Sequence, residues 1–326
     1  MLFGKKKRQV VLVYNDFVLK VLTSNSNDLS QAKVQSIPLD EGVVVDGMIE
    51  DELVFFELLK DHVKKWGIKS QNVSFYVPES TVMMKAIDHP QELVDVSSIK
   101  QYVEMEIGRT IHLPFENPLI DIYDAKPGDG KATIFATNAD EVQKVVGLLS
   151  DAGLTPVVAD IKVVSQIRLV DQVIPNLVNT TTLIANWSIN ELSLVIYSLG
   201  EVEFLRFQTI ETERSKWQSR YTEDGFDYFY NDEISEYQTA LMEPLSEIER
   251  IINFYHYSLN KGEKGVDQIV VMGDSPELLY IADMLGSQVA LPVHIFTDQV
   301  MAEEFPNFKA SQASLVSLAL KEVVKV

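Results

Sequence analysis

The strongest constraint on the fold is a strand pattern that occurs twice along the chain. Near the N-terminus, three short apolar segments are separated by polar residues, at Val10–Tyr14, Val18–Leu22 and Lys33–Ile37. Past a polar stretch from Pro175 to Thr182, the pattern repeats at Leu183–Trp187, Leu192–Tyr197 and Val202–Phe207. Short apolar runs bounded by Asn, Asp or Ser are typical of an antiparallel meander. The sequence therefore predicts two halves that each begin with three strands, with Asn15 and Asp16 at the first hairpin turn.

Mixed helical and strand patterns follow each meander. Apolar residues at helical spacing, with polar or glycine residues at their ends, predict helices at Glu50–Trp66, Ser97–Ile107, Ala139–Ala152, Lys162–Val173, Leu241–Tyr257, Pro276–Leu285 and Ser311–Lys321. Further strands are predicted at Gln71–Val77, Val82–Ile87, Leu119–Tyr123, Lys131–Thr137, Pro156–Ala159 and Gln268–Met272. A meander followed by helices and strands in each of two halves is the α/β layout of actin-like and sugar-kinase-like folds.

Two segments stand apart from this doubled plan. Residues 81–153 read β-α-β-β-α and predict a small α+β module, with Ser97 or Ser98 as the N-cap of its first helix. The stretch Tyr221–Glu249 holds nine acidic residues and neither Lys nor Arg. We expect it to be a loop leading into a helix: a solvated insertion, or a face for a basic partner.

Composition narrows the function classes. The chain has 326 residues, 28 Lys plus Arg against 48 Asp plus Glu, and a formal charge of −20. A nucleic-acid binder needs clustered cations for phosphates, so that class is disfavoured. Absence of cysteine excludes disulfides and thiolate chemistry and fits a reducing cytoplasm. Only the short Val10–Val13 run follows the basic Lys5–Arg8 leader, so we expect a soluble cytoplasmic protein without direct membrane insertion.

Familiar catalytic and metal motifs are absent from the sequence. Its five histidines are scattered without metal-ligand spacing, and no GxSxG, GxxxxGK[ST] or GxGxxG pattern occurs. A loop that holds phosphate needs small residues so that backbone N–H groups can approach the ligand. The turns within Tyr14–Lys20 and Asn186–Glu191 contain no glycine. The turn at Gly273, which follows a predicted buried strand, is the one turn whose backbone we expect to be accessible to an adenosine.

Several segments in order along the chain carry a family resemblance. They are Val77-Pro78-Glu79-Ser80-Thr81-Val82 continuing through Lys85 and Ile87 to Pro90, the helix Ile99–Ile107 with Glu104 and Glu106, Ile111-His112-Leu113-Pro114-Phe115, Glu247-Ile248-Glu249-Arg250 with Phe254-Tyr255, and Val270-Val271-Met272-Gly273. Together they resemble the PilM family, actin-like cytoplasmic proteins of type IV pilus assembly that are related in fold to the division protein FtsA. Asp274 replaces the second glycine of the family's "GG".

The resemblance implies an actin-like fold of duplicated, ribonuclease-H-like halves with an inserted SHS2-type subdomain. It implies a first half at 1–80 and 154–178, the SHS2-like module at 81–153, a second half at 179–310, and a C-terminal helix at 311–326 that docks on the first half. Family members bind ATP between the halves and capture the cytoplasmic N-terminal peptide of PilN, an inner-membrane protein. The resemblance thus implies association with the inner face of the membrane through partners, and leaves open other pilus platform and motor proteins and homo-oligomers.

The chain departs from the family at the nucleotide loops. The first loop resembles "D-I-G-S-x-x-V-K" with Val13 at the Asp, Asn15 at the Gly, Asp16 at the Ser and Lys20 at the Lys. The second loop's "D-x-G" falls on Asn186-Trp187-Ser188. Loss of an acid removes a Mg²⁺ ligand, and a Cβ at a nest position displaces phosphate. We interpret the site as degenerate and without hydrolysis, and nucleotide candidates remain at Asn15, Asp16, Lys20, Asn186, Ser188, Arg250, Gly273 and Ser275.

Peptide capture needs no catalytic residue, because a short apolar peptide can dock by strand addition or in an apolar cleft. Candidate groove residues are Val82, Met84 and Ala86 on the module's first strand, and Ile99, Val103 and Ile107 on its helix. The same residues could instead fill the core of the module.

Three functions therefore stay open. The first is a scaffold that binds a PilN-like partner, with nucleotide dispensable. The second is an actin-like ATPase that uses Asp16, Lys20 and Gly273 with Mg·ATP. The third is an FtsA-like division protein, although Leu315–Val326 resembles a docking helix more than a lipid anchor.

Overall fold

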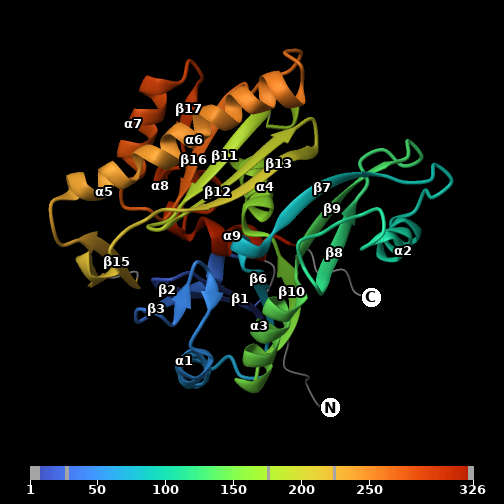
Figure 1. The fold of residues 1–326 in the computed structure, drawn as a ribbon. Helices are drawn as coiled ribbons and strands as arrows, with labels where there is room; N and C mark the ends of the chain where they lie inside the picture. Colours follow the sequence, from blue (N-terminus) through green and yellow to red (C-terminus); the bar gives the residue numbers. More distant parts are fainter. Residues whose placement is uncertain (1–7, 26–28, 175–176, 223–224, 322–326) are drawn as a thin grey trace.

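The computed structural model describes residues 8–25, 29–174, 177–222 and 225–321, and its first large sheet belongs to the N-terminal half (Figure 1). The strand order is β10-β6-β1-β2-β3. β1 is antiparallel to β2 and parallel to β6. The strands are β1 Gln9–Tyr14, β2 Val18–Ser24, β3 Lys33–Pro38, β6 Asn72–Tyr76 and β10 Thr155–Asp160.

The second large sheet repeats this topology in the order β13-β12-β11-β16-β17. Its first strand, β11, is antiparallel to β12 and parallel to β16, as β1 is to β2 and β6. The strands are β11 Thr181–Trp187, β12 Glu191–Ser198, β13 Glu201–Thr209, β16 Gln268–Gly273 and β17 Val293–Ile295. The predicted doubled meander is thus confirmed.

Helices cover both faces of the sheets. On the first sheet, α1 Glu52–Lys65 and α3 Ala139–Asp151 share one core cluster with β1 and β6. On the second sheet, α6 Met242–Asn253 and α7 Leu278–Gln288 share another core with β11 and β16, next to α5 Ile234–Ala240. A π-helical turn at Phe254–Leu259 continues α6, and Pro244 is accommodated in its first turn.

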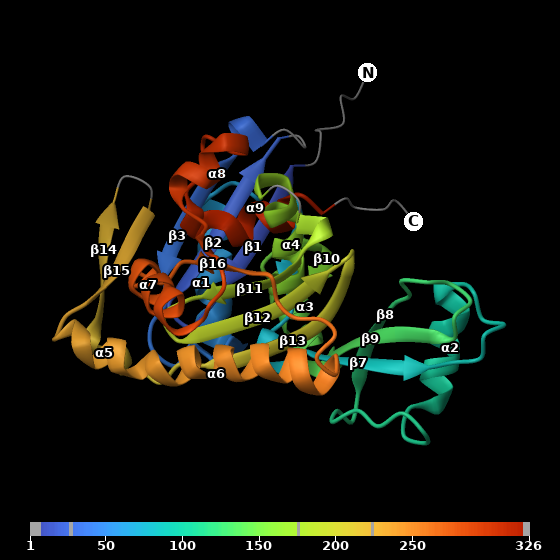
Figure 2. The ribbon, with the colours of Figure 1, turned by 90° about the horizontal axis from the view of Figure 1, so that it is seen from above.

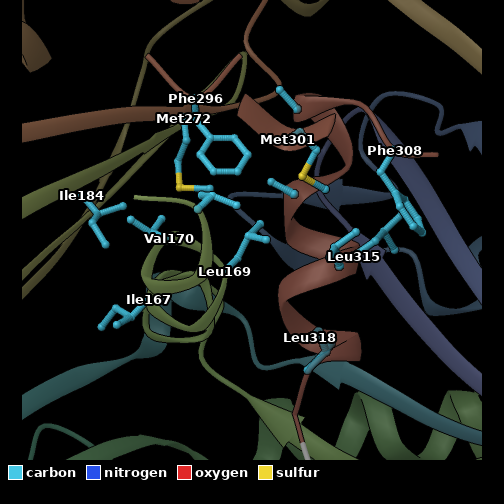
Figure 3. Packing of buried hydrophobic residues seen from close by; sticks show 14 of the residues in the cluster. Ile167, Leu169, Val170, Ile184, Met272, Phe296, Met301, Phe308, Leu315 and Leu318 are labelled. Atoms are coloured by element: carbon cyan, nitrogen blue, oxygen red, sulfur yellow. The ribbon is translucent and has the colours of Figure 1, made fainter. Parts of the chain in front are cut away.

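A third core cluster joins the two halves. Figure 3 shows its residues around α4 Lys162–Val173, α8 Asp298–Glu304 and α9 Ala313–Ala319. Both sheets contribute to it, for example through Val11 of β1 and Ile184 of β11. Because α4 and α9 are packed on both sheets, the halves meet over a continuous apolar surface.

The predicted module lies to one side of the halves (Figure 2). Its three-stranded sheet has the order β7-β9-β8, with β7 Met83–Asp88, β8 Pro118–Tyr123 and β9 Lys131–Asn138, and α2 Val96–Glu106 packs on one face. The N-cap of α2 is Asp95, whose carboxylate accepts the Ser98 amide, so the prediction of Ser97 or Ser98 is wrong. A carboxylate one turn earlier also favours the helix dipole.

The second helix of the predicted module packs elsewhere. α3 buries Val142, Val145 and Leu149 in the core of the first half, and the module's own core comes from α2 and the three strands. The boundary at residue 153 stays a prediction, and the packing places α3 with the first half.

A hairpin occupies part of the stretch that was expected to be a loop. β14 Trp217–Thr222 pairs antiparallel with β15 Gly225–Tyr230, and β15 lies against β3 of the first half. Trp217 stacks edge-on with Tyr230 and Tyr237, which supplies the apolar contacts that a two-stranded ribbon needs. A short hairpin of β4 Val44–Val45 and β5 Met48–Ile49 completes the sheets.

Some predictions fall outside the described residues. They are Lys5, Lys6 and Lys7 of the basic leader, Pro175 at the start of the predicted linker, and positions 322–326 of the C-terminal segment. Within the described ranges, no helix has both the length and the apolar character to span a membrane.

Candidate functional site

The turns of the two meanders meet between the halves. Asn15 Nδ2 donates to Ser188 Oγ at 3.3 Å, which joins the β1–β2 turn to the β11–β12 turn. The Asn15 side-chain oxygen also accepts the amides of Phe17 and Val18 and so shapes its own turn. The predicted nucleotide candidates Asn15 and Ser188 are therefore brought together, but they bond to each other.

Asp16 is fully engaged within the protein. Its carboxylate accepts the backbone amides of Asp46 and Gly47, at 2.9 Å each, and the side-chain amide of Asn190 at 2.6 Å. Burial raises the pKa of Asp16 above its usual value, although these three hydrogen bonds oppose the shift. Asp16 thus ties the β4–β5 turn and the second half to the first hairpin.

Lys20 closes the cleft from the other side. Its ammonium lies 2.6 Å from the Asp274 carboxylate, just past β16, and donates to the Ser311 carbonyl at 3.1 Å. The Lys20 side chain is 18% exposed and the Asp274 side chain is 25% exposed. The lysine that the resemblance places at phosphate is therefore neutralised by the second half.

A buried charge cluster lies deeper between the halves. Lys162, the first residue of α4, is 3.0 Å from both the Glu79 and the Glu191 carboxylates, and Ser193 donates to Glu79 at 2.6 Å. Burial opposes the charge of Lys162, but Glu191 and Glu79 outweigh it and raise its pKa. Burial raises the pKa of Glu191 to about 7 against the pull of Lys162, since one ammonium serves two carboxylates.

Little free space remains between the two turns. Two cavities of about 20 Å³ each lie on either side of Lys162. Each is about the size of a single water molecule, and both are lined by Tyr14, whose buried hydroxyl has no hydrogen-bond partner among the described residues. Asn186 stands where the family's second loop has its acidic residue, and its side-chain oxygen accepts a hydrogen bond from Gln166 Nε2 at 2.8 Å. In the described chain no three acidic or histidine residues are grouped for a metal, and this inner space does not fit a metal-bound polyphosphate.

An open groove of about 630 Å³ lies outside the Lys20–Asp274 pair. Asn15, Lys20, Gly273 and Ser275 all line it, and the pair also lines the inner cavity, so it stands between the two spaces. Gly273 has φ +125°, and a Cβ there would overlap the carbonyl of Trp187. This glycine is required by the close approach of β16 to β11.

Arg250 makes its ion pairs with residues of its own helix and with none of the other predicted nucleotide residues among those described. It lies exposed on α6 and pairs with Glu243 and Glu247 of the same helix, at 2.5 and 2.6 Å. The prediction that placed it at nucleotide is not supported by these contacts, because α6 covers the outer face of the second sheet.

The six predicted groove residues do not share one surface. Alternation along β7 puts Met83 and Ile87 on the α2 side and Met84 and Ala86 on the open face, whereas Val82 precedes β7 and packs against the core of the first half. Ile99 and Val103 are fully buried beneath α2, and Ile107 is half-buried beside them. The helical residues and Val82 therefore fill cores, the alternative left open above, and Met84 and Ala86 lie on the open face.

A second open groove, of about 480 Å³, lies where that open face meets the second half. Ala86, Tyr123 and Thr133 of the module line one wall, and Glu201 and Val202 of β13 line the other. The Tyr123 hydroxyl donates to the Gly200 carbonyl at 2.9 Å, and Lys126 pairs with Glu201 at 3.6 Å. The groove is thus walled by two bodies of the fold.

The sequence model of the family described as "Type IV pilus assembly protein PilM" matches residues 17–314. The chain belongs to the PilM family. No curated protein sequence matches it.

Solved structures agree with this assignment at the level of the fold. The structure described as a "PilM-PilN type IV pilus biogenesis complex" superposes with a TM-score of 0.73 at 16% identity, over 97% of this chain and 98% of that chain. EutJ, an ethanolamine utilization protein of Carboxydothermus hydrogenoformans, gives 0.52 at 8%, over 96% and 89%. ADP-bound MreB5 of Spiroplasma citri gives 0.50 at 10%, over 96% and 95%. The expected actin-like fold is confirmed.

Sequence reasoning missed the charge cluster of this PilM-family chain. Glu79 lay inside a family motif without a role, and Glu191 begins an apolar strand. Lys162 stands between Ile161 and the apolar pair Val163 and Val164, at the start of α4. A lone lysine in an apolar run is the available signal, since buried ammonium groups need carboxylate partners.

Proposed function

We propose that this PilM-family protein is a cytoplasmic scaffold of type IV pilus assembly that binds the N-terminal peptide of a PilN-like inner-membrane protein. The superposition on PilM of a PilM–PilN complex, over nearly the whole of both chains, supports a partner of this kind. Binding would hold the protein at the inner face of the membrane through that partner. Family membership supports the role in pilus assembly, and the groove beside the module supports the proposed site of peptide binding.

The open face of the module's sheet is the proposed capture surface. Ala86 is exposed, Met84 is half-buried, and Leu119 and Tyr123 of β8 are about two fifths exposed on the same sheet. The rim carries both signs of charge, including Asp88, Lys126 and Lys131. An apolar floor with a charged rim suits a short extended peptide.

Nucleotide is dispensable in this proposal. The observation that supports it is that side chains of the protein already join the halves: Lys20 with Asp274, Lys162 with Glu191, and Asp16 with Asn190. In an actin-like protein that relies on nucleotide for closure, the ligand would provide such bridging contacts. Here the bridging charges are paired without a ligand.

A peptide titration tests the proposal. The probe is a labelled synthetic peptide with the cytoplasmic N-terminal sequence of the PilN-like protein from the same organism, followed by fluorescence anisotropy. Ala86→Arg should weaken binding at least about tenfold, because it places a charged side chain on the apolar floor. Met105→Arg is the matched control, since Met105 is 62% exposed on α2, on the opposite side of the module. Absence of binding to the unmodified protein would contradict the proposal.

The nucleotide-dependent switch is a second candidate. The groove of about 630 Å³ beside Gly273 and Ser275 favours it, because that volume is in the range of small-molecule sites. Excess Mg·ATP at 100 times its Kd would stabilise the protein by about 2.7 kcal/mol, visible as a higher melting temperature. The scaffold proposal expects no rise, and a clear rise would favour the switch.

A further inference from the structure

The module is attached to the first half through a narrow neck. Residues 77–82 lead into β7, and β9 leads out at Asn138. Thr81 Oγ1 bonds both the Pro78 carbonyl, at 2.8 Å, and Thr137 Oγ1, at 2.6 Å, so the two connections are tied to each other. A movement at the neck is therefore transmitted to the whole module.

Glu79 places a buried carboxylate in this neck, four residues before β7 begins. One oxygen accepts the Val163 amide at 2.9 Å, at the start of α4. The other lies within 3.0 Å of Lys162 and accepts from Ser193 of β12 at 2.6 Å. Glu79 is 7% exposed. A single side chain of the neck is thus bonded to the second half, directly and through the Lys162–Glu191 pair.

The far end of the module also rests on the second half. Tyr123 bonds Gly200 in the turn between β12 and β13, and Lys126 pairs with Glu201 beside it. β12 therefore contacts the neck through Ser193. The β12–β13 turn contacts the far end, or tip, of the module at Tyr123 and Lys126. The groove of about 480 Å³ lies between the module and this same turn.

We infer that Glu79 is a positioning residue that couples closure of the two halves to the geometry of the groove between the module and the β12–β13 turn. This inference rests on the proposed function for its ligand, the PilN-like peptide. When the halves are joined, Glu79 and the tip contacts hold the module against the turn, and both walls of the groove are in place. When the Glu79 contacts to β12 are lost, the module keeps its chain connections, the contacts of Tyr123 and Lys126 with the turn, and the approach of β7 to β13.

Coupling of this kind is reciprocal. If closure strengthens peptide binding by some factor, the peptide favours the closed arrangement by the same factor. Peptide bound in the groove would therefore favour closure of the cleft between the halves, and a change in the cleft would alter the affinity for the peptide. No nucleotide is needed for this exchange, because Lys162 and its two carboxylates carry it.

A distance measurement tests the positioning step without any ligand. The chain has no cysteine, so a spin label will attach only to cysteines that are introduced. Two are needed, Met105→Cys on α2 and Tyr257→Cys in the π-helical turn that follows α6. Both side chains are more than three fifths exposed. Electron-spin distance measurements should give one narrow distribution in this background. Glu79→Gln keeps the shape of the side chain but removes its charge, and should shift or broaden that distribution.

The control is Glu236→Gln, which removes the Glu236–Lys216 ion pair inside the second half, away from both labels, and should leave the distance unchanged. Should Glu79→Gln fail to fold, Ser193→Ala removes only the direct bond to β12 and takes its place. An unchanged distribution in the Glu79 or Ser193 variant would overturn the inference.

Peptide titration supplies the second arm. The Glu79→Gln protein should bind the PilN-like peptide at least about fivefold more weakly, the lower end of usual coupling factors, and Glu236→Gln should bind as the unmodified protein does. A shifted distance with unchanged affinity would overturn the coupling. If the unmodified protein binds no peptide, the proposed function fails, and the distance arm alone decides whether Glu79 positions the module.

Discussion

The cleft between the halves and the groove beside the module occupy comparable places, each at a junction of two bodies. In the cleft, the ammonium groups of Lys20 and Lys162 both have carboxylate partners, and the space near Lys162 is reduced to cavities of about 20 Å³. In the groove, Ala86 and Lys131 are exposed and the open volume is about 480 Å³. An actin-like chain can thus keep the family fold while the inner part of its cleft, near Lys162, is filled by its own side chains. Open volume remains outside the Lys20–Asp274 pair, in the groove of about 630 Å³, and at the module.

The chemistry of the two regions differs for a physical reason. Buried charges persist only when they are paired, and removal of one partner leaves the other in a poorly solvating interior. Lys162, Glu79 and Glu191 meet that condition inside the cleft. Groove charges are solvated and carry no such requirement. Substitutions in the cleft should therefore lower stability, whereas substitutions in the groove should change peptide binding with little effect on stability.

The largest effect is expected from Lys162→Met. It leaves two carboxylates buried without their cation and should lower the free energy of unfolding by about 3–5 kcal/mol, measured by urea denaturation. Lys131→Met, in the exposed wall of the groove, is the matched control and should change stability by less than about 0.5 kcal/mol. Equal effects of the two substitutions would remove the distinction between cleft and groove.

Gly273→Ala should follow in size. The added Cβ would overlap the Trp187 carbonyl at a residue with φ +125°, so the approach of β16 to β11 must loosen. We expect a loss of about 2–3 kcal/mol in the free energy of unfolding. Gly286→Ala, inside α7 with no atom near the added Cβ, should instead be neutral or gain up to about 1 kcal/mol. A tolerated Gly273→Ala would mean that this turn is loose.

The raised pKa of Glu191 should make the stability of the protein depend on pH. Its pKa is about 7 in the folded protein against 4.5 for an ordinary glutamate, so the folded state binds more protons in that window. Stability should therefore fall as pH rises through the window, by an amount of order 2 kcal/mol. Melting temperatures at about pH 5 and about pH 8 measure it. Asp16 shifts in the same direction, so the test is that Glu191→Gln shows the smaller fall.

The smallest effect is expected at the Lys20–Asp274 pair. The Lys20 and Asp274 side chains are 18% and 25% exposed, and a partly solvated pair contributes about 1 kcal/mol. A double-mutant cycle of Lys20→Met and Asp274→Asn, followed by denaturation, gives this coupling directly. A coupling near zero would mean that the pair does not help to close the cleft.

Local patterns in the sequence were sufficient for the doubled sheets. Period-two and helical patterns placed β1, β2, α1 and α4 to within a few residues, because each buries one face against a neighbour. The β14–β15 hairpin was missed, since its stability comes from Trp217, Tyr230 and the distant Tyr237 rather than from its own pattern. Long-range contacts leave no local signal.

The same limit explains what sequence could say of the site. The turns at Asn15 and Ser188 were placed correctly, but their mutual hydrogen bond joins positions in different halves. Met84 and Ile99 were assigned to one groove, although β7 presents its side chains to two faces and only one of them is open. Which face α2 covers is decided by tertiary packing.

The most direct test of the account is the affinity of the PilN-like peptide for nucleotide-stripped protein, measured with and without Mg·ATP. Because the halves are joined by their own side chains, the account predicts binding without nucleotide and a Kd that changes by less than about twofold when Mg·ATP is added. Binding that appears only with Mg·ATP would contradict it and would make the protein a nucleotide-dependent switch.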